Sequence, residues 1–207
     1  MNPKDAPRRR YSSTRREQQA AQTRSDVLAA AVQLFGTQGW TATTMGAIAS
    51  QAGVAVETVY SGFGSKKQLL RAAMDAAVVG DADPVALADR PEWARMGVGT
   101  IEQRMRAGVE LQAAIHARSA GVWAALREAA SDHEIAEWCA DMEQTRRGEL
   151  ARAIDLILGR QLEETTVDLL WAILAPEVYL KLVVELAWPS AQYEEHMCDV
   201  ALRLVDR

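Results

Sequence analysis

The side chains best suited to binding chemistry lie on one short predicted helix, residues 55–62. Its inward position is Val59, and Glu57, Thr58 and Ser61 lie on the outward face. Short polar groups on an exposed helix can hydrogen-bond to base edges in a major groove, which is about 12 Å wide. The pattern therefore favours nucleic-acid recognition by this helix.

Other kinds of site have weaker signatures. His133 and Cys139 are six residues apart and do not share a helix face, so we expect no metal site. The sequence contains no nucleophile–base arrangement, no paired-carboxylate signature and no phosphate-binding loop. We therefore expect neither an enzyme nor a bound cofactor.

The charge of the chain is divided unevenly along its length. Residues 1–70 carry nine basic and four acidic side chains, whereas residues 71–207 carry fourteen basic and twenty-four acidic ones. A basic end can approach nucleic acid or an anionic surface, while the acidic remainder would be repelled by it. A solvated basic tail on an acidic protein is the alternative interpretation.

The composition excludes several classes of protein. Of the 207 residues, 49% are apolar and 25% charged, which is typical of a soluble globular chain of one or two domains. No apolar run resembles a secretory signal or reaches the roughly 18 residues of a membrane span. Cys139 and Cys198 lie far apart, so a disulfide scaffold is not indicated. We expect a cytoplasmic protein that does not associate with membranes.

Apolar residues recur at helical spacing through most of the chain, which predicts an all-α fold. Residues 1–13 are expected to form a disordered basic arm. A first helix begins between Thr14 and Ser25 and ends near Thr37, with Gly39 as the stop signal. Further helices are predicted at about 44–51 and 55–62, and after a Ser65–Gln68 capping box.

The two short helices are joined by Ala52, Gly53 and Val54, an arrangement typical of a helix-turn-helix. An ordinary αα-corner is the alternative. A loop is expected from Gly80 to Pro91, and a capping box of Ser131 and Glu134 is expected to open a helix that ends near Leu158.

The last third of the chain is apolar around most of the helix circumference. From Thr166 to Ala187 only Glu177, Lys181 and Glu185 form a polar stripe, and Pro176 should interrupt the helix. We predict a homodimer interface in this region; packing into the same domain is the alternative. The proposed interface residues are Tyr179, Val183, Leu186, Met197, Ala201 and Leu204.

Residues 24–70 resemble the DNA-binding domain of the TetR family of one-component transcriptional regulators. The residues that carry the resemblance are Ala30–Ala31, Leu34–Phe35, Gly39–Trp40, Thr43–Thr44, Ile48–Ala49, Ala52–Gly53–Val54, Thr58–Val59–Tyr60, Phe63, Lys66 and Leu69–Leu70. The resemblance implies a helix-turn-helix DNA-binding domain over 14–70. It also implies a helical domain over 71–207 that binds a ligand and dimerises.

The resemblance implies roles for individual residues in binding double-stranded DNA. Phosphates would be held by Thr43, Thr44, Thr58, Tyr60 and Lys66, and base edges would be read by Val56, Glu57 and Ser61. Glu57 could instead simply complement the helix dipole. Basic contacts could be extended by Arg8, Arg9, Arg10, Arg15 and Arg16, unless these only make a solubilising tail.

Two positions depart from the family pattern. Ala55 stands where the family usually has a capping Ser, so the helix after it loses a hydrogen bond worth about 1 kcal/mol. Gly62 stands where the family often has His, which removes one phosphate contact and loosens the end of the recognition helix. Both changes make the operator sequence harder to infer.

The resemblance further implies a pocket whose occupant changes DNA affinity. Side chains suited to a flat apolar ligand are Trp93, Met96, Met105, Trp123, Trp138 and Met142, which could alternatively be core residues. His116 and Arg118 could orient a polar group of the ligand. The expected protein is a homodimeric repressor of a pseudo-palindromic operator, controlled by a small molecule. Control by a protein partner, or activation in place of repression, are the alternatives.

Overall fold

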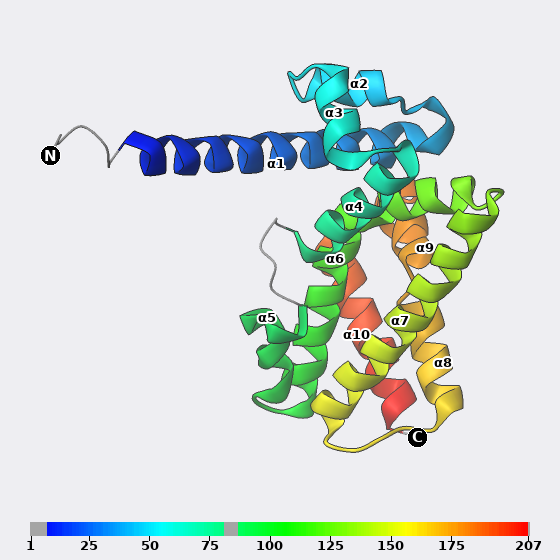
Figure 1. Ribbon diagram of the computed structural model, residues 1–207. Helices are drawn as coiled ribbons and strands as arrows, with labels where there is room; N and C mark the ends of the chain where they lie inside the picture. The colour runs from blue at the N-terminus through cyan, green and yellow to red at the C-terminus, as the bar shows by residue number, and fades with distance from the viewer. Residues whose placement is uncertain (1–7, 81–86, 207) are drawn as a thin grey trace, which may run out of the picture.

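The computed structural model describes residues 8–80 and 87–206. These ranges are helical and contain no strand, which confirms the all-α prediction. The long helix α1 (Arg8–Ala42) projects from one end of a body that the later helices build (Figure 1). No helix within the described ranges combines the length and the apolar character that a membrane span requires.

Helix α1 is longer than the sequence suggested. Residues 8–13 were expected to belong to a disordered arm, but they form its first turns; residues 1–7 lie outside the described residues. The physical reason is that propagation of an existing helix adds one hydrogen bond per residue, and Arg is a good helix former. The helical path breaks at Gly39 (φ 75°, ψ −174°), close to the predicted end.

The next three helices agree with their predicted positions. They are α2 (Met45–Gln51), α3 (Val56–Phe63) and α4 (Lys66–Val79). The Thr44 side chain accepts a hydrogen bond from the Ala47 N–H, and the Ser65 side chain accepts one from the Gln68 N–H. Ala55 precedes α3 without any side-chain cap, as predicted.

Two long antiparallel helices form the middle of the body. After short turns at Leu87–Asp89 and Arg95–Gly97, which flank α5 (Pro91–Ala94), the chain enters α6 (Ile101–Ala129) and α7 (His133–Leu158). The predicted cap of α7 was wrong by one residue. Asp132, not Ser131, caps it by accepting from the Ile135 N–H at 3.4 Å, because Asp132 adjoins the first helical turn.

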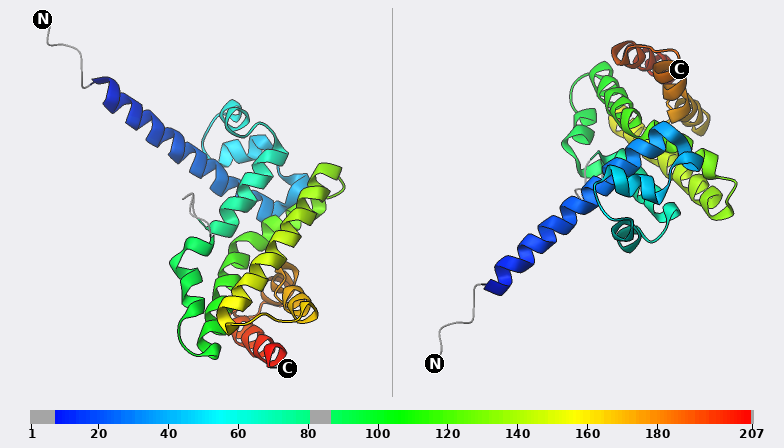
Figure 2. Two further views of the ribbon diagram at one scale, coloured as in Figure 1. Left: turned by 60° about the horizontal axis from the view of Figure 1, so that its bottom comes forward. Right: turned by 90° about the horizontal axis from the view of Figure 1, so that it is seen from above.

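The C-terminal helices gather at one side of the body, as the view from above in Figure 2 shows. They are α8 (Glu164–Ile173), α9 (Pro176–Tyr179) and α10 (Ser190–Val205), with a π-helical turn at Leu180–Glu185 between the last two. Pro176 separates α8 from α9 as predicted, because its ring cannot continue a helix.

The buried apolar side chains form two cores. The first core contains residues of α1–α4, together with the last turns of α6 and the first turns of α7, among them Val122, Leu126 and Ile135. The second core lies between the other ends of α6 and α7 and the C-terminal helices. Helices α1 and α6 cross closely at Gly36 and Gly121, where a Cβ on Gly121 would lie 2.7 Å from the Gly36 carbonyl oxygen.

Candidate nucleic-acid interface and cavity

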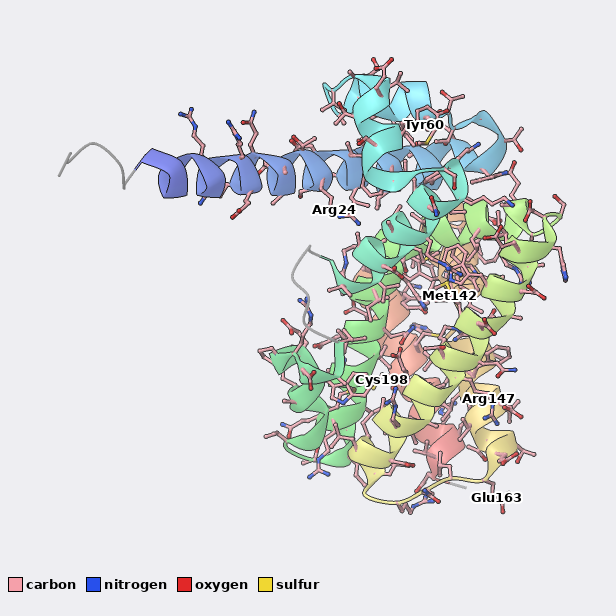
Figure 3. The ribbon with its side chains drawn as sticks, viewed as in Figure 1. Arg24, Tyr60, Met142, Arg147, Glu163 and Cys198 are labelled. Carbon is pink, nitrogen blue, oxygen red and sulfur yellow. The ribbon has the colours of Figure 1, made fainter. Side chains whose placement is uncertain are left out.

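Helix α3 presents an exposed polar face at the end of the molecule far from the C-terminus (Figure 3). Tyr60 is 52% exposed, and Glu57, Thr58 and Ser61 are also exposed, while Val59 and Phe63 anchor the opposite face in the first core. Val56 is half-buried at the start of the helix. The structure thus places the predicted base-reading and phosphate-binding residues of α3 on one accessible surface.

Two neighbouring threonines before α2 have different surroundings. Thr44 is exposed and caps α2, so its hydroxyl and the free N–H groups of the first turn face solvent. Thr43 is fully buried, and its hydroxyl donates to the Gly39 carbonyl oxygen at 2.7 Å. The expected phosphate contact of Thr43 is therefore wrong, because the break at Gly39 turns this side chain inward.

Lys66 begins α4 in a partly buried position. Its ammonium donates to the Trp40 carbonyl oxygen and lies 4.1 Å from the centre of the Trp40 ring. Burial lowers the pKa of Lys66, and the nearby Glu128 carboxylate opposes this shift. Lys66 thus fastens the end of α1 to the start of α4, and a phosphate would have to compete with these contacts.

The end of the recognition helix is held by α1. The Arg24 guanidinium lies 4.5 Å from the centre of the Phe63 ring and donates to the Gly62 carbonyl oxygen at 3.5 Å. These contacts offset the looseness expected from Gly62. Arg15 and Arg16 are exposed further along α1. Arg8, Arg9 and Arg10 lie on its first turn, and their side chains are outside the described residues.

A cavity of about 440 Å³ lies inside the body, between α4, α5, α6 and α7. Its volume is within the range of small-molecule sites. Five of the six residues predicted to bind a ligand line it, namely Trp93, Met96, Met105, Trp123 and Met142. The sixth, Trp138, does not: it lies one turn before Met142, nearer the start of α7, where it packs against the first core beneath the Arg71 guanidinium.

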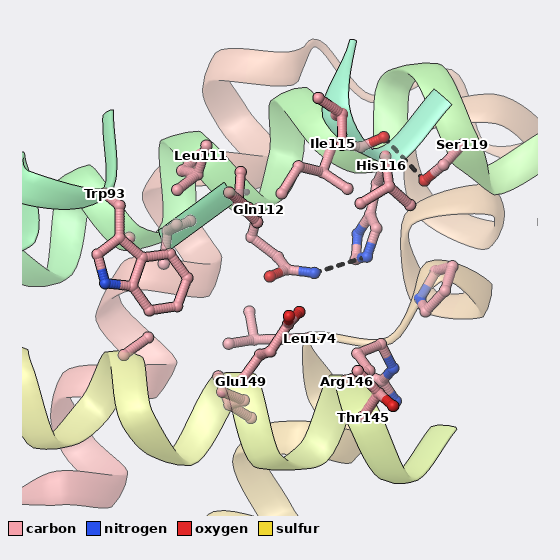
Figure 4. A pocket seen from close by; sticks show the side chains of 18 of the residues that line it. Trp93, Leu111, Gln112, Ile115, His116, Ser119, Thr145, Arg146, Glu149 and Leu174 are labelled. Carbon is pink, nitrogen blue, oxygen red and sulfur yellow. Dashed lines mark hydrogen bonds between the residues drawn. The ribbon is translucent and has the colours of Figure 1, made fainter. Parts of the chain in front are cut away.

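The polar groups of the cavity come mainly from α6 and α7 (Figure 4). His116 is 2% exposed, and its Nε2 lies 2.8 Å from the Gln112 side-chain nitrogen. Burial, aided by the charge of Arg146, lowers the pKa of His116 to about 3, so the ring is neutral near pH 7. Its Nδ1 has no hydrogen-bond partner among the residues that the structure describes.

Arg118, expected to orient a ligand, has a different position. Its guanidinium donates to the carbonyl oxygens of Ala77 at 3.1 Å and Val78 at 3.2 Å. It therefore ties α6 to the last turn of α4 and does not line the cavity. The expected ligand role of Arg118 is wrong, because unpaired carbonyls at a helix end are strong acceptors for a guanidinium.

Helix α4 joins the two sites physically. Its first turn follows the recognition helix directly, and Met74, Asp75, Val78 and Val79 from its second half line the cavity. At its start, the Lys67 ammonium lies 2.7 Å from an oxygen of Asp132 in the corner between α6 and α7. Helix α4 thus contacts the cavity, the recognition helix and the α6–α7 corner.

The C-terminal helices divide the predicted interface residues into two groups. Tyr179, Met197 and Ala201 are buried in the second core, so their expected place in a subunit interface is wrong; the helical spacing also places these side chains toward their own body. Val183 and Leu204 are half-buried and Leu186 is 58% exposed. Further exposed apolar side chains on these helices are Leu169, Val184 and Val200.

Comparisons with known proteins agree with this geometry. Residues 27–73 match the family model described as bacterial regulatory proteins, tetR family. No similar sequence is found among curated proteins. Similar folds occur in three solved Rhodococcus structures. A protein assigned to the TetR family has a TM-score of 0.68 at 17% identity and covers 89% of this chain and 98% of its own.

The other two are a transcriptional regulator and a TetR-like transcriptional regulator. The first has a TM-score of 0.64 at 21% identity, with 86% of this chain and 93% of its own covered. The second has a TM-score of 0.62 at 18% identity, with 89% and 96% covered. These likenesses concern the whole fold, and the family model concerns the DNA-binding helices. Residues 27–73 thus match the DNA-binding helices of the tetR family model, and the chain as a whole shares the fold of a protein described as a TetR-family transcriptional regulator.

Several residues of both sites were missed by sequence reasoning. Glu128 binds the last turn of α1, and Gln112, Arg146 and Glu149 supply polar groups of the cavity. The one local signal was the spacing of four residues between Gln112 and His116, which places both on one helix face. The others depend on contacts between distant segments.

Proposed function

We propose that this regulator is a homodimeric repressor whose affinity for a pseudo-palindromic operator changes when a small, largely apolar molecule occupies the cavity. In this proposal, residues 14–70 form the domain that reads DNA, and residues 71–207 form the domain that binds the effector and dimerises. The observation that carries the proposal is the double role of α4, which follows the recognition helix and lines the cavity.

The proposed control requires two states with different affinities for the effector. Binding can shift the equilibrium only by the difference between those affinities. Two DNA-reading units at a fixed spacing fit half-sites about 34–36 Å apart, so a small rotation of each unit changes the fit. Since the connection through α4 and α6 is made of packed helices, a change at the cavity can rotate the unit as one body.

Dimerisation is supported by apolar side chains left exposed on the C-terminal helices. Val184 is 62% and Leu186 58% exposed, and Leu169 and Val200 are exposed on the adjoining helices. Exposed apolar clusters of this kind commonly mark protein–protein contacts. A second copy that covers this face would place two α3 helices on one assembly.

The test is selection of genomic fragments by the purified protein at about 150 mM salt, an ionic strength at which weak phosphate contacts are screened. We expect one pseudo-palindromic site by footprinting, with binding lost in Tyr60→Ala and the fold retained because Tyr60 is exposed. Retention of all fragments alike, with steep salt dependence, would contradict sequence-specific reading.

A further inference from the structure

The charged groups of the cavity are not balanced among the residues that the structure describes. The lining contains one cationic side chain, Arg146, and two carboxylates, Asp75 and Glu149. The Arg146 guanidinium is already engaged: it donates to Glu143 at 3.1 and 3.2 Å and to the Trp171 carbonyl oxygen at 3.1 Å. It also lies 4.7 Å from the centre of the Trp171 ring.

These contacts leave Arg146 poorly suited to an anionic ligand. Glu143 neutralises its charge, and both side chains are largely buried, so an incoming carboxylate would have to replace an existing ion pair. The other basic candidate, His116, is neutral near pH 7, as described above. Within the described lining, no cationic group is therefore free to receive an anion.

The two carboxylates are in the opposite situation. Burial raises the pKa of both Asp75 and Glu149, and the charges of Arg71 and Arg152 only partly oppose this. The Arg152 guanidinium is 3.8 Å from Glu149, beyond a hydrogen bond, and its side chain is mostly exposed. Neither carboxylate is thus hydrogen-bonded to a cation among the described residues, and a cationic ligand would stabilise the charged form that burial disfavours.

Glu149 faces a second acceptor across the cavity. Figure 4 shows its carboxylate directed toward the amide of Gln112, with the Trp93 ring nearby. Because the Gln112 nitrogen is engaged with His116, its carbonyl oxygen remains an acceptor on the cavity side. A carboxylate, an amide oxygen and an indole face together favour a cation that carries N–H donors.

We propose that the cavity takes an organic cation, namely a flat apolar molecule with a protonated amine or ring nitrogen held between Glu149 and Gln112. Its apolar body lies along Trp93, Met96 and Trp123. This inference rests on the proposed function only in treating the cavity as the effector site. It adds the charge of the effector, which neither the fold nor the volume specifies.

The experiment compares two probes of nearly identical shape by fluorescence titration without DNA. 9-Aminoacridine is a cation at pH 7.5, and acridine is uncharged at that pH. We expect the cation to bind at least tenfold more tightly to the wild-type protein. In Glu149→Gln, which keeps the size of the side chain, the ratio should fall to near one. Asp141→Asn removes an exposed acid from the same helix outside the cavity and should leave the ratio unchanged.

The inference is overturned if acridine binds as tightly as 9-aminoacridine, if neither probe binds, or if the preference persists in Glu149→Gln. Operator retention, measured on the same preparations, is independent of these outcomes. A protein that retains one operator but prefers the neutral probe would remain a regulator with an uncharged effector. A protein that binds the cation but selects no operator would contradict the proposed function alone.

Discussion

Glu128 and Thr41 are 87 residues apart in the sequence, yet the Glu128 carboxylate accepts from both the hydroxyl and the backbone N–H of Thr41, at 2.5 and 3.1 Å. The same carboxylate accepts from the Trp40 N–H at 2.7 Å. Gly39 provides the space, because a Cβ there would lie 2.5 Å from a Glu128 oxygen. The end of α6 is thereby fixed to the last turn of α1, just before the helix-turn-helix.

Replacing Glu128 with Gln should therefore make the free energy of unfolding less dependent on pH in the acid range. The hydrogen bonds from Thr41, then those from Trp40, lower the pKa of Glu128 below 4.5. Their contribution is present above pH 4.5 and is lost as the pH falls through the lowered value. Urea unfolding should show Glu128→Gln less stable than wild type at pH 7 and closer to it at pH 3. Asp141→Asn serves as the control; a constant difference at both pH values would contradict this account.

The crossing of α1 and α6 should not tolerate a side chain on Gly121. Its Cβ would lie 2.7 and 2.8 Å from Gly36 backbone atoms, which cannot move without shifting a helix. We expect Gly121→Ala to lower the free energy of unfolding by about 1–3 kcal/mol. Gly148→Ala, on α7 with no atom within 4 Å, should raise it by about 0.5–1 kcal/mol. Denaturant titration of both variants checks the contrast, and equal effects would refute it.

A hydroxyl at position 55 should stabilise the recognition helix. Ala55 has an extended backbone (φ −68°, ψ 145°) but no side-chain cap. Serine there can accept from an N–H of the first turn, and we expect Ala55→Ser to add about 1 kcal/mol to the free energy of unfolding. Ala55→Gly, measured in the same denaturant titration, separates the hydrogen bond from backbone effects. A gain no larger in Ser than in Gly would count against a missing cap.

His116 should make the protein less stable in mild acid. The unfolded ring takes up a proton near pH 6.5, whereas burial keeps the native ring neutral until about pH 3. The unfolded state therefore binds more protons between these values, and stability falls with the pH by about 1.4 kcal/mol per unit. Between pH 6.5 and 4.5, the free energy of unfolding of the wild type should fall with this slope relative to that of His116→Phe. Parallel pH profiles of the two proteins would exclude it.

The C-terminal face should respond to a charge as a subunit interface does. Val184→Asp introduces a carboxylate among exposed apolar side chains, where a second copy would bury it without a partner. Light scattering should then give the mass of a monomer in place of a dimer. Val98→Asp, at a position 72% exposed on a different part of the body, is the matched control and should remain dimeric. An unchanged mass in Val184→Asp would remove this face from the interface.

The helix-turn-helix was predictable because its signals are local. Thr44, Gly53 and Ser65 end or begin helices through contacts within a few residues, so their spacing carries the fold of this segment. Thr43 shows where local reasoning stops. Its type and position match a phosphate contact, but its side chain is buried and its hydroxyl donates to the Gly39 carbonyl oxygen.

The cavity was predictable in its apolar residues and in His116, but not in its other polar residues. Aromatic and Met side chains can be recognised in the sequence as suited to an apolar ligand, and five of the six predicted residues line the cavity. Glu149 resembles any solvated acid in the sequence, and its role depends on the facing of α6 and α7. The prediction for Trp138 was wrong for the same reason, because the helical spacing of a residue does not specify which neighbouring helix its side chain contacts.

The first core has a consequence for protein engineering. Since Val122, Leu126 and Ile135 complete the apolar packing of α1–α4, a fragment ending at Val79 would expose much of that surface to water. A chimaera that joins α1–α4 to the body of another protein would therefore also have to include the α6–α7 corner. Helices α1–α4 and the body that follows them are thus not independent modules, because a substitution in one part must also fit the packing of the other.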